Sequence, residues 1–202
     1  TIMKGFDSER VIGNALINMY GKHNRLDEAQ YVFHKMLEWD VVTWTSMITI
    51  YSQEGRSREA LQIFEKMRDA NVKADKVAFI SGLAACTTHM AMADGKQMHV
   101  RLVHSDLLIN SVVCNSLLSM YASCRSTVDA EMVFDQMTNR DVVSWNTIIK
   151  MHIRLGYDLQ AVQMWSQMKI EGFLPDNVTY ISILEACGNL GAIVLGNYMS
   201  SC

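Results

Sequence analysis

Apolar residues recur at helical spacing in short segments along the chain. In several segments an alanine is followed at i+3, i+4 and i+7 by two larger apolar residues and a methionine, which places the four on one face of a helix. These sets are Ala29/Val32/Phe33/Met36, Ala60/Ile63/Phe64/Met67 and Ala130/Val133/Phe134/Met137. Another apolar segment precedes each set, and a Gly or polar cluster, such as 21–24 or 53–56, separates the two. The pattern predicts pairs of short amphipathic helices joined by tight turns.

The helix pairs belong to an internal repeat. Shifting the sequence by 101 residues aligns similar residues without a gap, among them Asn14 with Asn115 and Trp44 with Trp145. The period divides into segments of 31, 35 and 35 residues. The segments are 10–40, 41–75 and 76–110, and the cycle restarts at 111–141, 142–176 and 177–202, the last one cut short. Such periods are typical of stacked-repeat proteins.

A single helical hairpin cannot bury both of its apolar faces, so neighbouring hairpins stack. We therefore predict an all-α fold, an α-solenoid of stacked antiparallel helical hairpins that forms one continuous domain and a right-handed superhelix. Small residues recur where the two helices of a hairpin would approach most closely. They are Ala29, Ala60, Ala130 and Ala161.

Composition supports a folded helical chain. Half of the residues are hydrophobic, 19% are charged, and Pro175 is the single proline. There is no run of about 18 apolar residues, so we expect no membrane partner. The five cysteines form no C-x-x-C pair, which indicates a reducing compartment and thiols used as small buried groups. A net charge of −3 argues mildly against a partner bound mainly through its phosphates.

The sequence lacks the signatures of common catalytic sites. No P-loop, nucleophile elbow, dinucleotide fingerprint or zinc deaminase motif is present. We expect no enzyme activity, no cofactor and no metal site. The histidines are predicted on helix surfaces or in turns, and the tryptophans in the core. The histidines are His23, His34, His89, His99, His104 and His152, and the tryptophans are Trp39, Trp44, Trp145 and Trp165.

Several segments resemble the pentatricopeptide repeat. They include GNALINMYGKHNRLDEAQYVFHKM, DVVTWTSMITIYSQEGRSREALQIFEKM and AFISGLAACTTHMAMADGKQMHV. The alternating lengths resemble the plant-type variety with short, standard and long motifs. The resemblance implies short repeats at 10–40 and 111–141, standard repeats at 41–75 and 142–176, long repeats at 76–110 and 177–202, and the tail of a preceding long repeat at 1–9. Tetratricopeptide repeats, with their uniform period of about 34 residues, fit less well.

Four repeats combine a polar residue near the start with an aspartate at the end. The pairs are Asn14 with Asp40, Thr45 with Asp75, Asn115 with Asp141, and Asn146 with Asp176. Such a pair could hydrogen-bond a base edge, although both members could instead be helix N-caps. The resemblance implies one RNA base per repeat, with Asn–Asp preferring U and Thr–Asp preferring G. The long repeat 76–110, with Ile80 and Asn110 at these places, is expected to space rather than read, which predicts U-G-N-U-U from 5′ to 3′.

A valine also recurs in one register of all six repeats, at Val11, Val42, Val77, Val112, Val143 and Val178. The resemblance implies that it packs against base faces, although it could equally pack on a neighbouring helix. The implied function is to select the site of C-to-U editing in a mitochondrial or chloroplast transcript, with other editing-complex proteins as further partners. Transcript stabilisation, splicing support and a protein-binding scaffold without RNA remain alternatives, and any targeting segment is expected outside this sequence.

Overall fold

The computed structural model describes residues 2–200, with the side chains of 9–88 and 90–191. This part of the chain is helical and contains no strand. It divides into two structural units, residues 1–101 and 102–202. None of its helices is both long enough and apolar enough to cross a membrane.

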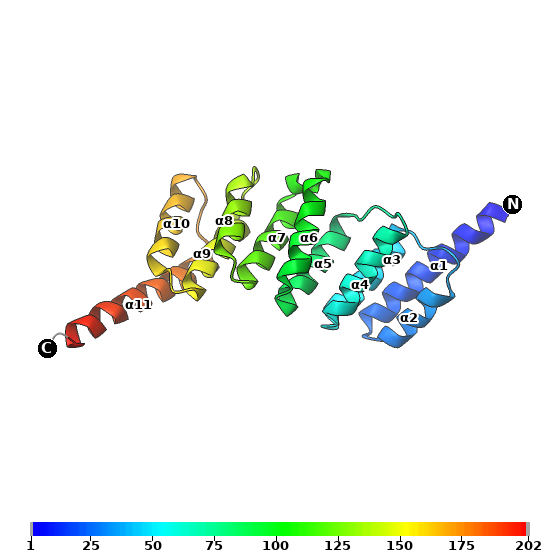
Figure 1. Cartoon of the computed structure of the whole chain (residues 1–202), viewed down its shortest axis with the longest axis horizontal. Helices are drawn as coiled ribbons and strands as arrows, with labels where there is room; N and C mark the ends of the chain where they lie inside the picture. The colour runs from blue at the N-terminus through cyan, green and yellow to red at the C-terminus, as the bar shows by residue number, and fades with distance from the viewer. Residues whose placement is uncertain (1, 201–202) are drawn as a thin grey trace. The chain divides into compact units, whose positions relative to one another are not determined.

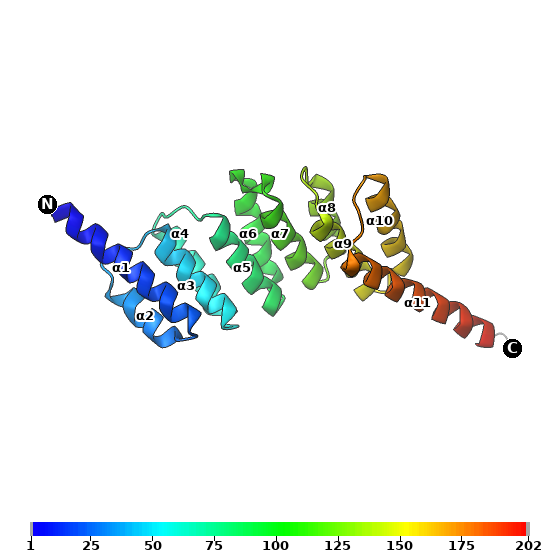
Figure 2. The ribbon, with the colours of Figure 1, turned by 180° about the vertical axis from the view of Figure 1, so that it is seen from behind.

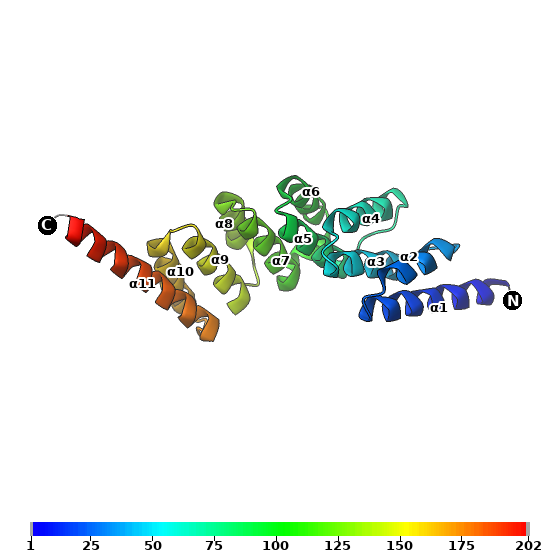
Figure 3. The ribbon, with the colours of Figure 1, turned by 90° about the horizontal axis from the view of Figure 1, so that it is seen from below.

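The first unit consists of helical hairpins (Figure 1). Their bounds are α1 (Ile2–Lys22) with α2 (Leu26–Lys35), α3 (Val41–Gln53) with α4 (Ser57–Asp69), and α5 (Lys76–His89) with α6 (Met92–Val103). The helices α1, α3 and α5 pack side by side in that order, and α2 and α4 cover them from one side (Figure 3). Each hairpin therefore contributes one helix to an inner row and one to an outer row.

The second unit repeats this arrangement (Figure 2). A short 3-10 helix, η1 (Asp106–Ile109), precedes α7 (Ser111–Ser123) with α8 (Thr127–Gln136), α9 (Val142–Arg154) with α10 (Asp158–Ile170), and α11 (Asn177–Ser200). Here α7, α9 and α11 form the row of first helices. The helix α11 continues through Gly188 and Gly191, whereas the matching segment of the first unit is interrupted at Met90.

First helices begin where the predicted repeats begin, at Val41, Lys76, Ser111, Val142 and Asn177. The exception is α1, which begins at Ile2 and runs through the segment expected to be the tail of a preceding repeat. The assignment of short, standard and long types stays a prediction, as does that tail.

The turn inside each described hairpin is made in the same way. One residue at the fifteenth position of the repeat adopts positive φ, and these residues are Asn24, Gly55, Met90, Arg125 and Gly156. Glycine adopts this conformation without the steric cost that a Cβ atom imposes. Glycine at two of the five turns and asparagine at Asn24 suit this conformation, whereas Met90 and Arg125 do not.

Small and aromatic residues build the core. The alanines expected at the closest helix approach, Ala29, Ala60, Ala130 and Ala161, are completely buried. At the junctions between hairpins, Trp44 packs edge-on against Phe33 at a centroid distance of 5.3 Å, and Trp145 packs against Phe134 at 4.7 Å. Each of these tryptophans links its hairpin to the one before it.

Three groups of expectations need correction. Trp39 is 39% exposed because it stacks on Phe33 at the rim of the junction, and Trp165 is only half-buried. Among the cysteines, Cys86 and Cys114 are buried, but Cys124 is half-buried and Cys187 is exposed. His152, expected on a surface, is only 3% exposed because it lies on the packed face of α9. His89 and Cys202 lie outside the described side chains.

Candidate nucleic-acid interface

The four aspartates at the ends of the repeats cap the helices that follow. Each carboxylate accepts a hydrogen bond from the backbone N–H three residues later. The distances are 2.9 Å for Asp40 with Thr43, 2.8 Å for Asp75 with Ala78, 2.9 Å for Asp141 with Ser144 and 2.8 Å for Asp176 with Thr179. The N-cap interpretation of the aspartates is therefore correct, since these carboxylates satisfy otherwise unpaired N–H groups at the helix start.

The same carboxylates also bind the polar residue of the preceding hairpin. The side-chain Nδ2 atom donates to an Asp oxygen at 3.1 Å in Asn14–Asp40, 3.0 Å in Asn115–Asp141 and 3.0 Å in Asn146–Asp176, and the Thr45 hydroxyl meets Asp75 at 3.2 Å. The structure thus joins all four predicted pairs. The N-cap interpretation of the polar residues is wrong, because they lie inside their helices, past the cap position.

A third side chain joins two of the pairs. The Thr43 hydroxyl lies 2.7 Å from Asn14 Oδ1, and the Thr179 hydroxyl lies 2.6 Å from Asn146 Oδ1. Ser144 occupies the corresponding place beside Asn115, but its hydroxyl turns to the backbone oxygen of Asp141 at 2.8 Å. These hydroxyl residues were not predicted from the sequence. The signal was present, because Asp-x-x-Ser/Thr at a helix start is a form of capping box.

Hydrogen bonding holds three of these carboxylates in their charged form. Burial raises the pKa of Asp40, but the bonds from the Thr43 backbone and hydroxyl and from Asn14, with Arg10 nearby, outweigh it and leave the pKa below its usual value. Burial likewise raises the pKa of Asp141, and hydrogen bonds again lower it overall. For Asp176, the Thr179 N–H is the largest influence and lowers the pKa. A carboxylate that stays charged is a strong acceptor for the Asn amide.

The recurring valines lie on the surface beside these pairs. Their exposed fractions are 65% for Val11, 46% for Val42, 41% for Val77, 55% for Val112, 58% for Val143 and 39% for Val178. The alternative in which they pack chiefly on a neighbouring helix therefore accounts for only part of their surface. Except for Val11, which lies in the middle of α1, each of these valines is the second residue of its helix, and all six leave apolar surface exposed.

The long repeat lacks a polar pair of this kind. Ile80 is half-buried and has no hydrogen-bonding side chain. Asn110 caps α7 instead, because its side-chain oxygen accepts from the backbone N–H groups of Val112 at 3.1 Å and Val113 at 3.3 Å.

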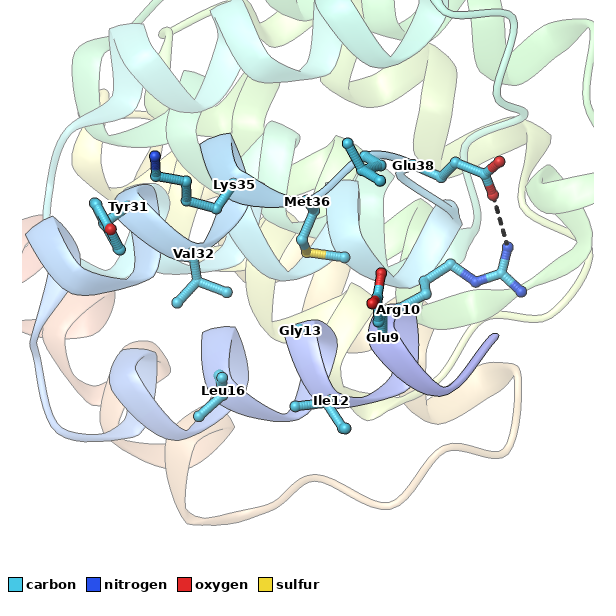
Figure 4. Close-up of a pocket in the computed structure, with 11 residues that line it drawn as sticks. Glu9, Arg10, Ile12, Gly13, Leu16, Tyr31, Val32, Lys35, Met36 and Glu38 are labelled. Atoms are coloured by element: carbon cyan, nitrogen blue, oxygen red, sulfur yellow. Dashed lines mark ion pairs between the residues drawn. The ribbon is translucent and has the colours of Figure 1, made fainter. Parts of the chain in front are cut away.

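A cavity of about 350 Å³ lies elsewhere, between α1 and α2 (Figure 4). Its lining is mostly apolar and includes Ile12, Gly13 and Leu16 from α1, Val32 from α2 and Met36 directly after α2, with the ion pair of Arg10 with Glu38 at one edge. The three α1 residues correspond by repeat register to Thr43, Trp44 and Met47, which are buried in α3. Among the described residues, no group of His, Cys, Asp and Glu is placed to hold a metal ion.

Comparisons with known proteins identify the repeat. One family model, described as the PPR repeat family, matches residues 39–87 and 140–189, and a second, described as the PPR repeat, matches 14–41 and 112–142. A putative pentatricopeptide repeat-containing protein of Arabidopsis thaliana is 35% identical over 95% of this chain and 27% of its own length. A mitochondrial one from the same plant is 35% identical over 98% of this chain and 31% of its own length. The chain thus spans less than a third of these relatives.

Solved structures share the fold. The crystal structure of the pentatricopeptide repeat protein PPR10 from maize matches with a TM-score of 0.71 at 22% identity, covering 93% of this chain and 29% of that one. PPR10 in complex with an 18-nucleotide psaJ RNA element matches with a TM-score of 0.77 at 20% identity, covering 94% and 29%. This likeness confirms the predicted α-solenoid of helical hairpins. With family models matched across both structural units, the chain belongs to the pentatricopeptide (PPR) repeat family.

Proposed function

We propose that the chain binds single-stranded RNA, with one base at each Asn–Asp or Thr–Asp pair. The observation that carries the proposal is the set of four polar pairs, two in each structural unit, each formed across two hairpins and each accompanied by an exposed valine. RNA-binding proteins commonly combine a surface that stacks on a base with groups that hydrogen-bond its edge. The RNA complex of PPR10, which has the same fold, supports this proposal.

The hydrogen bonds within the pairs support the predicted base preferences. An Asn amide that gives one N–H to Asp has a second N–H to donate, and uracil offers carbonyl oxygens that accept it. The Thr45 hydroxyl that donates to Asp75 keeps its lone pairs, which can accept from the N–H groups of guanine. The proposed core is therefore U-G-N-U-U, read 5′ to 3′ by repeats 10–40, 41–75, 76–110, 111–141 and 142–176.

The whole protein is proposed to act as the site-recognition part of an organelle C-to-U editing factor. Two observations support this proposal: the repeat lengths alternate as in the plant-type subfamily, and the relatives include mitochondrial and chloroplastic proteins. Editing-complex proteins would then be further partners.

Binding to a fluorescent RNA with U-G-A-U-U inside an adenine-rich strand tests the proposal. We expect the wild type to prefer G over U at the second position, and Thr45→Asn to reverse this preference. Selective hydrogen bonding worth about 1 kcal/mol corresponds to a roughly fivefold change in Kd. The matched control is Thr147→Asn, because Thr147 is half-buried and its hydroxyl donates to the backbone oxygen of Val143 in its own helix.

If Thr45→Asn changes no preference while the wild type binds RNA, the pair does not read the base. If neither protein binds above a scrambled strand, even when further repeats are fused to the chain, the protein-scaffold alternative replaces RNA binding.

A further inference from the structure

We propose that the third residue of a repeat is a specificity-determining residue for the base that the preceding repeat binds. In this chain these residues are Thr43, Ser144 and Thr179, which follow the readers Asn14, Asn115 and Asn146. The inference rests on the proposed function, because it concerns how the same polar pairs present themselves to RNA. At Thr43 and Thr179 the hydroxyl group fixes which atoms of the Asn carboxamide face the base.

Two contacts of opposite character hold the Asn146 carboxamide. Asp176 Oδ1 accepts from its Nδ2 at 3.0 Å, and the Thr179 hydroxyl donates to its Oδ1 at 2.6 Å. Carboxylates only accept, and a hydroxyl has one proton to donate, so the amide cannot rotate by half a turn without breaking both bonds. The oxygen is thereby used inside the protein, and one N–H remains to be offered to a base.

The hydroxyl itself is held by the cap. It accepts a hydrogen bond from the backbone N–H of Asp176 at 3.2 Å, which leaves its single proton for Asn146 or for Asp176 Oδ1 at 2.9 Å. The Asn146 contact is the shorter of the two. The same set of contacts is found around Thr43, with Asn14 at 2.7 Å and Asp40 Oδ1 at 2.9 Å.

The residue types within this chain vary together as the proposal requires. Each Asn reader is followed by a hydroxyl residue at the third position of the next repeat, whereas the reader Thr45 is followed by Ala78, and Ile80 is followed by Val113. A carboxamide has two ends that differ in hydrogen bonding and needs orienting. A threonine hydroxyl that already donates to Asp75 does not.

Ser144 shows what happens when the orienting bond is absent. Its hydroxyl donates to Asp141, at 2.8 Å from the backbone oxygen and 3.1 Å from Oδ1. The Oδ1 atom of Asn115 is consequently buried without a partner. Serine lacks the methyl group that restricts the side-chain rotamers of threonine. We infer that Asn115 discriminates less sharply than Asn14 or Asn146.

Reciprocal variants test the inference at two positions of the same RNA. Thr179→Val keeps the shape but removes the proton donor, and should reduce the preference for U over the other bases at the fifth position by about fivefold, the loss expected from one hydrogen bond of about 1 kcal/mol. Thr179→Ser, which can still donate, should retain part of it. Ser144→Thr should increase the preference for U at the fourth position. In each variant, the base preferences at the other positions should not change. A general loss of structure would instead weaken the preferences at all positions.

A second readout needs no RNA. Hydrogen exchange of the Asn146 side-chain NH₂ group, followed by NMR, should become faster in Thr179→Val, while the Asn115 group in the same protein stays unchanged. If the exchange rate of the Asn146 NH₂ group is unchanged in Thr179→Val, the inference is wrong. It is also wrong if the wild type selects bases and Thr179→Val keeps the same preference for U. If the wild type selects no bases, the proposed function fails, and the exchange measurement still decides whether Thr179 orients the amide.

Discussion

Asn146 and Asp176, separated by 29 intervening residues, are joined by an Nδ2–H···Oδ1 hydrogen bond of 3.0 Å, and the same Asp176 oxygen accepts the N–H of Thr179 at the start of α11. The carboxylate therefore belongs to the fold and to the proposed reading site at once. A substitution of such an aspartate should change both stability and binding, and experiments must separate the two.

Acid should remove the stabilising effect of Asp141. Its pKa in the folded protein lies below the ordinary value because hydrogen bonds from Ser144 and Asn115 outweigh the effect of burial. A group with a lowered folded pKa stabilises the fold above its unfolded pKa, about 3.9 for Asp, and loses that effect as the pH falls through the folded value. Urea unfolding should show that wild type exceeds Asp141→Asn in stability at pH 7 and that the difference shrinks below about pH 4. A pH-independent difference would contradict this.

Mild acid should destabilise the fold by protonating His152. Burial lowers the pKa of this imidazole, and Glu131, whose Oε1 lies 3.4 Å from Nε2, offsets part of the effect. Between the folded pKa and the unfolded value of about 6.5, the unfolded chain binds more protons, so stability falls as the pH falls through this window. The His152→Phe variant should lose less stability between pH 8 and pH 5 than the wild type. A stability difference between the two proteins that stays constant from pH 8 to pH 5 would contradict this.

Introducing a glycine at one hairpin turn and removing a glycine from another should change the stability of the fold in opposite directions. Arg125 adopts φ of 58°, where a side chain costs about 1–2 kcal/mol, and Gly156 adopts φ of 77° at the same repeat position. Arg125→Gly should raise the free energy of unfolding by about 0.5 kcal/mol, since the relief of strain exceeds the entropic cost of glycine. Gly156→Ala should lower it by about 1 kcal/mol. Thermal unfolding of both variants measures the two changes in stability. If both variants are stabilised, or both destabilised, positive φ does not determine the stability of these turns.

Substitution of a recurring valine should weaken RNA binding without destabilising the fold. Val143 is 58% exposed, so Val143→Ser should change the free energy of unfolding by no more than about 0.5 kcal/mol. If this side chain packs on a base, the loss of about 1 kcal/mol should raise the Kd for U-G-A-U-U RNA roughly fivefold. The matched control is Leu159→Ser, an equally exposed apolar residue on the outer helix α10. Equal losses of affinity in the two variants would argue against the stacking role.

The repeat length and the hydrophobic spacing were sufficient to predict the helical hairpins. They also showed that Asn14 and Asp40 recur as a pair, but the hydrogen bond that joins the two side chains across neighbouring hairpins was not predicted. The register of the valines was likewise predictable, since a fixed period places equivalent residues on equivalent surfaces.

Contacts that depend on side-chain rotamers were not predictable. Thr43 and Ser144 differ by one methyl group, yet their hydroxyls bind different atoms, and no spacing rule distinguishes them. The burial of His152 was missed because histidine is common on surfaces, although this one lies on the apolar face of α9. Positive φ at Met90 and Arg125 was also hidden, because neither residue type favours it.

Because neighbouring hairpins share these helix caps, one repeat cannot be moved into another array without changing the contacts of the repeat before it. A segment cut at 41–75 carries its own reader, Thr45, together with Asp75, but it also carries Thr43, which contacts Asn14 of the repeat before it. Grafting such a segment into another array would alter the specificity of its upstream neighbour as well as add its own. For designed arrays, the exchangeable module should therefore begin after the third residue of a repeat and end after the third residue of the next one.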